Sequence, residues 1–203
     1  MSYFNLQLLD TISSVAMAGA ALFAAIIAFS QLKKLNDSNV RLEESNNDYL
    51  LVEKSKIVME IDKRYESDVI INSRTEFSKI WNECEEIVIN NNDGLDSANI
   101  KTKVNELMSG KLNELRRTNQ PEYLKTMEII GLWETVGLMY KMDRLDRVLL
   151  MELYDSAIIK SVGGAKIHIK KRQEDPNFRN AKYMENALYL LSEAEKPINE
   201  RYK

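Results

Sequence analysis

The stretch from Thr11 to Leu32 contains no charged side chain, and no other feature of the sequence constrains the fold as strongly. As a helix rising about 1.5 Å per residue, this stretch is long enough to cross a hydrocarbon core of about 30 Å. Asp10 is the only charged residue before Lys33. The sequence therefore predicts a transmembrane helix over residues 11–32.

The alternatives to a membrane span are a buried core helix and a cleaved signal peptide. Ala18-Gly19-Ala20 resembles a cleavage site, but a signal peptide begins with a basic segment, and no Lys or Arg precedes residue 33. The same asymmetry sets the orientation, because Lys33, Lys34 and Arg41 follow the uncharged stretch. We therefore expect residues 1–10 to form a short extracytoplasmic tail and the rest of the chain to lie in the cytoplasm.

Small side chains recur along one side of the predicted span. Every fourth position is an alanine, at Ala16, Ala20, Ala24 and Ala28. On a helix these positions share a face, which lets a second helix approach closely in lipid. We expect homo-oligomers to form through this anchor association face, the alternative being that alanine is simply tolerated in a membrane.

Residues 33–49 form a polar stretch that we interpret as a helical stalk between the anchor and a domain. Apolar residues recur at seven-residue intervals at Leu35, Leu42 and Tyr49, whereas the companion positions are Asn39, Asn46 and Glu53. Because a coiled coil needs apolar residues at both positions of each repeat, this signal is incomplete.

Residues 50–203 have the composition of a helical domain. The whole chain has only three prolines and seven glycines, and its apolar residues recur at helical spacing without strand-like alternation. Helices are expected over residues 50–65, 77–88, 97–117, 121–141, 146–162, 165–173 and 180–195. The predicted fold class is all-α, with one transmembrane helix continuing into the stalk and then an irregular bundle of about five to six helices.

The stretch from Pro121 to Lys141 is the most apolar of the domain and is predicted to form the centre of its core. Leu124, Trp133 and Tyr140 recur there at helical spacing. Core packing is the expected role of the two aromatic residues, and the alternative is that they line an apolar pocket.

Composition argues against two large classes of function. The chain has 28 Lys plus Arg against 31 Asp plus Glu, so no basic field predicts nucleic-acid binding. With a single histidine, His168, and a single cysteine, Cys84, no His/Cys metal cluster can form, and no glycine-rich phosphate loop or nucleophile elbow is present. The sequence therefore predicts no catalysis and no cofactor, and Glu83, Glu85 and Glu86 are interpreted as a solvated face.

A basic stretch near the C-terminus is the candidate binding site. The residues singled out for anion or lipid-headgroup contact are Lys166, His168, Lys170, Lys171 and Arg172. Gly163-Gly164 is expected to end one helix, so that the next begins there with free N–H groups facing an anion. The alternative is that the glycines merely turn the chain while the lysines face solvent.

Three parts of the sequence carry a resemblance to a known family. They are Gln31–Leu35 at the end of the anchor, Leu132–Leu138 with the following Asp143–Tyr154, and Pro176–Met184. In these parts the chain resembles a bacterial family of small single-pass membrane proteins with a helical cytoplasmic domain of unknown function. The chain departs from the family pattern at residues 162–164, where an aromatic residue is expected. The resemblance implies a location in the bacterial inner membrane.

These observations lead to two main functional hypotheses, and an enzyme is kept as a third because helical hydrolases can carry catalytic carboxylates without a recognisable motif. The first is an oligomeric, membrane-anchored interaction or sensing module, whose partners are the lipid bilayer and either a cytoplasmic protein or a small anionic ligand. The alternative is a membrane-disrupting effector of antiviral or stress defence, whose cytoplasmic domain receives a signal. The alanine-rich span is compatible with both.

Overall fold

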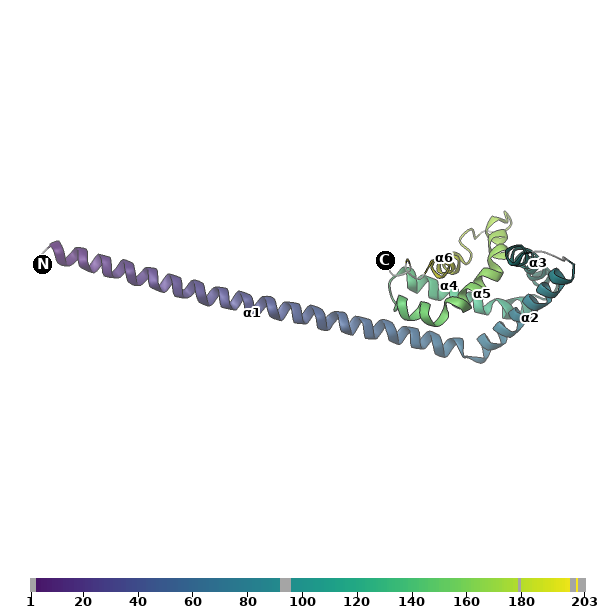
Figure 1. Cartoon of the computed structure of the whole chain (residues 1–203), viewed down its shortest axis with the longest axis horizontal. Coiled ribbons are helices and arrows are strands. Elements are labelled where there is room, and N and C mark those ends of the chain that lie inside the picture. Colours follow the sequence, from purple (N-terminus) through teal and green to yellow (C-terminus); the bar gives the residue numbers. More distant parts are fainter. Residues whose placement is uncertain (1–2, 92–95, 179, 198–199, 201–203) are drawn as a thin grey trace. The chain divides into compact units, whose positions relative to one another are not determined.

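The regular structure of the protein is entirely helical. A computed structural model describes residues 3–91, 96–178, 180–197 and 200, with side chains from residue 29 onward. In this part of the chain six helices and no strand are present, which confirms the all-α prediction (Figure 1). The helices are α1 (Tyr3–Tyr65), α2 (Asp68–Asn91), α3 (Ser97–Thr118), α4 (Gln120–Lys141), α5 (Arg147–Glu174) and α6 (Glu185–Ala194).

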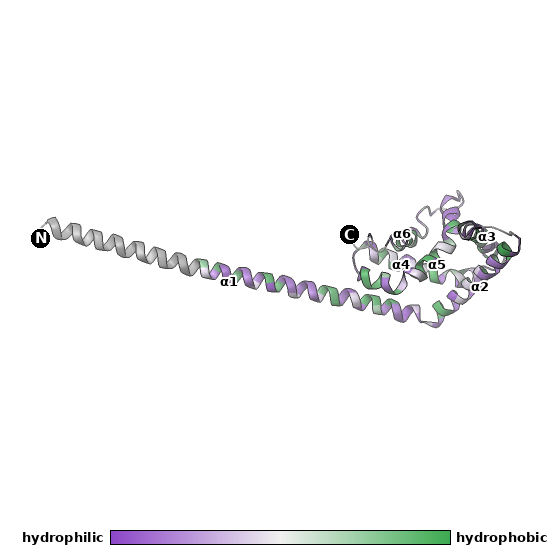
Figure 2. Cartoon of the chain, viewed as in Figure 1, coloured by the Kyte–Doolittle hydropathy of each residue, from purple (hydrophilic) through white to green (hydrophobic). Residues whose placement is uncertain are grey.

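The chain divides into two units, residues 1–51 and 52–203. In the first unit the described side chains, residues 29–51, are all exposed, and Figure 2 shows polar and apolar residues alternating along this part of α1. Among the described residues no helix combines the length and the apolar character that a membrane span requires. Most of the predicted anchor, together with the tail and the alanines of the association face, lies outside the described side chains.

Helix α4 forms the centre of the second unit, as predicted. It packs against α2, α3, α5 and α6. Trp133 and Tyr140 are fully buried, which confirms their expected role in the core. The apolar spacing was misleading only at Leu124, which is 54% exposed. The interior of the domain is therefore built around one helix that is enclosed on most of its sides.

Three helices of this unit begin at an acidic or amide side chain that accepts a hydrogen bond from a free N–H of the first turn. Asp96 accepts from the backbone N–H of Asn99 at 2.8 Å, Asn119 from Glu122 at 3.3 Å and Asp146 from Leu149 at 3.0 Å. Such caps stabilise a helix end by about 1 kcal/mol, and they place the starts of α3, α4 and α5 within a residue of the predicted positions.

The start of α6 is stabilised by a different helix. Residues 180–184 precede α6 as turns, so the predicted start at residue 180 was wrong. Met184 has a left-handed φ of 53° and no side-chain cap. Instead, the Glu134 carboxylate of α4 accepts hydrogen bonds from the N–H of Ala187 at 2.8 Å and from the Asn186 amide at 2.7 Å. A carboxylate at this helix end also complements its partial positive charge.

The predicted helix break at Gly163-Gly164 was also wrong. Helix α5 continues through both glycines, which are buried. A Cβ atom on Gly164 would lie 3.0 Å from the Trp81 ring and 3.2 Å from the Phe77 ring. Gly164 therefore serves close packing between α5 and α2, because the missing side chain leaves space for two aromatic rings.

Candidate functional site

A small pocket lies between α2 and α5. We call it the α2–α5 pocket, and its volume is about 150 Å³. The lining residues are Tyr65, Arg74, Phe77, Ser78, Ile129, Ala157, Lys160 and Ser161. Pockets for drug-sized ligands are about 300–1,000 Å³, so this one has room only for a small group such as a carboxylate or a phosphate.

The wall of the pocket is aromatic and firmly held. The Tyr65 ring packs against Trp133 at 5.7 Å and Tyr154 at 5.1 Å between ring centroids. Trp133 donates its indole N–H to the Ser161 hydroxyl at 2.8 Å, and Tyr154 donates its hydroxyl to the Asp62 carboxylate. Burial raises the pKa of the Tyr65 and Tyr154 hydroxyls, so both stay neutral at physiological pH. The wall is thus uncharged and rigid.

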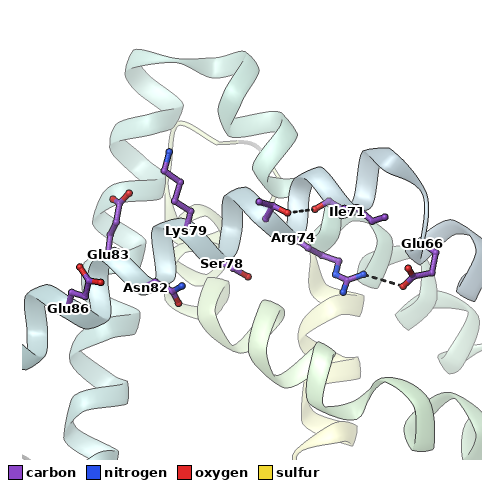
Figure 3. A pocket seen from close by; sticks show the side chains of 9 residues that line it. Glu66, Ile71, Arg74, Ser78, Lys79, Asn82, Glu83 and Glu86 are labelled. Atoms are coloured by element: carbon purple, nitrogen blue, oxygen red, sulfur yellow. Dashed lines mark hydrogen bonds and ion pairs between the residues drawn. The ribbon is translucent and has the colours of Figure 1, made fainter.

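Two cationic side chains line the same pocket. The Arg74 guanidinium lies 4.0 Å above the centre of the Tyr65 ring, a cation–π arrangement that fixes its plane. Its charge is shared with Glu66, 3.3 Å away, which lines the larger hollow drawn in Figure 3. Lys160 is exposed and has no ion-pair partner within the described part of the chain. An anion in the pocket would therefore meet one positioned guanidinium and one uncompensated ammonium group.

Helix α2 carries a larger hollow that shares Arg74 and Ser78 with the α2–α5 pocket. This outer α2 hollow has a volume of about 770 Å³ and is drawn in Figure 3. Its charges are mixed, because Lys79 and Arg74 are accompanied by Glu66, Glu83 and Glu86. Lys111 lies 2.6 Å from the Glu83 carboxylate, and its hydrogen bond and charge lower the pKa of that group. A polar, open surface of this kind is suited to transient contacts with water and ions.

The basic stretch predicted as an anion site does not form one surface. Because α5 is continuous at Gly163-Gly164, no helix N-terminus with free N–H groups exists there. Lys166 pairs with Glu195 of the segment after α6, 3.5 Å away. Arg172 stacks 3.5 Å from the centre of the Phe178 ring. The two remaining lysines, Lys170 and Lys171, are exposed. The helix N-terminus on which the predicted anion contact rested is therefore absent.

His168 lies in the interior and is not available to solvent. Its Nε2 is 2.9 Å from the Tyr123 hydroxyl, which in turn is 3.3 Å from the Tyr183 hydroxyl. Burial and the nearby guanidinium groups of Arg116 and Arg172 lower the pKa of His168 to about 4. Burial raises the pKa of the Tyr123 hydroxyl, so the hydrogen bond joins two neutral groups. The cluster is an internal hydrogen-bond network.

The remaining candidate for chemistry is the thiol of Cys84. It is free and buried, and burial raises its pKa, which keeps it protonated and poorly nucleophilic. Among the described residues no group of three or more His, Cys, Asp or Glu side chains is arranged to hold a metal ion.

Sequence reasoning did not find the α2–α5 pocket. Lys160 stands at the start of the basic stretch, but Arg74 and Ser78 belong to a helix far away in the sequence. Residue spacing shows which side chains share a face of one helix, but it does not show which two helices meet. The only sequence signal for this pocket was the presence of a basic residue on each of the two helices. Comparison with protein-family models, with curated proteins and with solved structures finds no match for the chain.

Proposed function

We propose that the protein is a membrane-anchored helical sensing module that binds a small anionic ligand in the α2–α5 pocket and catalyses no reaction. The observation that carries this proposal is the lining of that pocket. A ring-stacked guanidinium and an unpaired ammonium group flank an uncharged aromatic wall. Guanidinium and ammonium groups are the side chains that bind carboxylates and phosphates, and Arg74 is already oriented by Tyr65.

The membrane part of the proposal rests on the sequence. The uncharged residues 11–32 span the bacterial inner membrane, with residues 1–10 outside and the domain in the cytoplasm. The stalk over residues 33–49 separates the membrane span from the cytoplasmic domain. Ala16, Ala20, Ala24 and Ala28 bring two or more anchors together in the bilayer.

A thermal-shift experiment on the full chain in nanodiscs tests ligand binding, with inorganic phosphate and acetate as probes. A ligand that binds only the folded state raises Tm, so phosphate should raise the Tm of the natural chain. In the double variant Arg74→Gln/Lys160→Gln the rise should disappear. The matched control, Lys170→Gln/Lys171→Gln, removes two exposed cations from the same helix α5 and should keep the rise.

Two results would contradict the proposed pocket. One is a Tm rise that survives in the Arg74→Gln/Lys160→Gln variant. The other is a rise that is lost in the Lys170→Gln/Lys171→Gln control, which would move the site to the basic stretch. Absence of any shift with either probe in the natural chain would remove small anions as the ligand class.

Fractionation of lysed cells tests the anchor separately. The full chain should sediment with membranes and resist extraction by salt and alkali, because only the apolar span holds it. Recovery of the intact chain in the soluble fraction would refute the anchor. Depolarisation of cells that express the full chain, absent when residues 1–32 are removed, would favour the membrane-disrupting alternative over sensing.

A further inference from the structure

The part of α1 that precedes the domain carries an apolar ridge that ligand binding does not use. Leu32, Leu35, Leu42 and Tyr49 each expose between 61% and 66% of their surface. They lie on a regular helix in which all side chains from residue 29 to residue 51 are exposed. Large apolar side chains repeated along one strip of a helix usually mark a contact surface.

We infer that this ridge is the seam of a parallel, in-register, two-stranded coiled coil between two copies of the chain. In a heptad lettered a to g, the core positions d and a follow each other at intervals of four and three residues. Here the d positions are Leu35, Leu42 and Tyr49, and the a positions are Leu32, Asn39 and Asn46. One register therefore places all four ridge residues at a or d, whereas the exposed apolar residues Phe29, Val40, Leu50 and Leu51 lie at other positions.

Asn39 and Asn46, at the a positions, favour a second copy of the chain in parallel orientation as the partner. In a parallel, in-register dimer an a residue meets the same a residue of the other copy, so Asn39 faces Asn39 and Asn46 faces Asn46. Each amide can then bond to its equivalent. In an antiparallel or shifted pair the same amides would be buried against leucine without a partner, which is unfavourable. A second copy thus fits this surface better than an unrelated helix does.

The positions of the charged side chains in this segment are also compatible with a parallel coiled coil. Lys33, Lys34, Asp37, Arg41, Glu44 and Asp48 all take the outer positions b, c and f. The only charge beside the seam is Glu43 at e, which in a parallel dimer faces Ser38 at g of the other copy. No like charges oppose each other across the seam, so two identical helices meet without repulsion.

The seam ends where the domain begins. Glu53 would be the next a residue, but it belongs to the second unit and pairs with Lys56 at 2.6 Å. Its charge therefore does not count against the coiled coil. The inference deepens the proposed function by naming the partner, and it rests on that function only for the common orientation that an anchor gives to all copies.

Disulfide crosslinking of the full chain in native membranes tests the seam. Single cysteines are introduced at seam positions, as Leu35→Cys and Leu42→Cys, and at outer positions, as Asp37→Cys and Glu44→Cys. Disulfides form only where Cβ atoms approach to about 4 Å, so the seam variants should give at least about tenfold more crosslinked dimer than the outer variants. The natural chain, with only the buried Cys84, gives the background.

A second variant tests the asparagines. Replacing both, as Asn39→Val/Asn46→Val, removes the amides that fix the register, so a mixture of Leu35→Cys and Leu42→Cys copies should then also form a disulfide between the two different variants. Equal crosslinking at seam and outer positions, no crosslinking, or adducts with another protein would each overturn the inference. Failure of phosphate binding would appear in the Tm experiment and leave the crosslinking pattern unchanged, whereas failure of the anchor would appear in the fractionation experiment as soluble chain.

Discussion

The two sides of helix α2 differ in what they contact and in how open they are to solvent. Its inner side packs on α4, where Ser73 is fully buried and bridges the two helices. The Ser73 hydroxyl donates to the carbonyl of Thr126 at 2.9 Å and accepts from the N–H of Ile129 at 2.9 Å. Its outer side carries Arg74, Ser78 and Lys79 along open hollows. Atoms of the inner side are fixed by neighbours, whereas those of the outer side remain available for a ligand.

This contrast between the two sides of α2 separates residues that stabilise the domain from residues that contact solvent. Interior positions are determined by close packing, and small changes there disturb several helices at once. Side chains of the outer side contribute little to folding because water already solvates them. The predictions below test this division, from the largest expected effect on stability to the smallest.

Among the described glycines, the one with the least room for a side chain lies where α4 packs on α6. A Cβ atom on Gly137 would lie 2.1 Å from the backbone carbonyl oxygen of Asn186. Gly137→Ala should therefore destabilise the domain by about 3 kcal/mol or more, because backbone atoms cannot swing aside as a side chain can. Urea unfolding followed by circular dichroism measures this loss.

A matched control lies on the same helix. A Cβ atom on Gly131 would have no atom within 4 Å. Gly131→Ala should stabilise the domain by about 0.5–1 kcal/mol, since alanine favours the helix over glycine. If Gly137→Ala proved as harmless as Gly131→Ala, the close fit of α4 on α6 would not be a determinant of stability.

The buried His168 should make stability depend on pH. Its pKa is lowered to about 4 in the folded state, from about 6.5 when unfolded, so the unfolded chain binds the proton more tightly. The stabilisation is complete above pH 6.5 and is lost as the pH falls towards 4, by up to about 3 kcal/mol. Urea unfolding at pH 7, 6 and 5 measures the slope. A His168→Gln variant should flatten it, and an unchanged slope would locate the pH dependence elsewhere.

A serine pair on α2 compares the two sides directly. Ser73→Ala removes both bridging hydrogen bonds and should destabilise the domain by about 1–2 kcal/mol. Ser78→Ala changes a half-buried pocket residue and should alter stability by less than about 0.5 kcal/mol. Chemical denaturation of both variants gives the comparison, and equal losses would show that the outer side of α2 is also part of the stable interior.

The smallest effect is expected at the ion pair between Glu83 and Lys111, where the side chains retain 47% and 29% of their exposure. Solvent and salt screen such pairs, so Glu83→Gln should leave the unfolding midpoint nearly unchanged. Unfolding in low and high salt provides the measurement. A clear loss of stability that persisted in high salt would indicate that this pair is more important to the fold than its exposure suggests.

Amino-acid order alone correctly predicted the helical class, the burial of Trp133 and the starts of three helices. These follow from residues close together in the chain, because apolar periodicity and capping side chains act within one or two turns. Gly163-Gly164 was misinterpreted for the same reason. A local rule treats paired glycines as a helix end, but here Gly164 accommodates Trp81 and Phe77 from another helix.

Which polar residues are buried and which are exposed to solvent depends on tertiary packing. His168 and the lysines beside it look alike in the sequence, yet the packing of α5 against Tyr123 buries the histidine and leaves Lys170 and Lys171 in solvent. Arg74 and Lys160 meet at one pocket for the same reason. Local patterns specify which face of a helix is apolar, but the neighbours that cover this face come from distant parts of the chain.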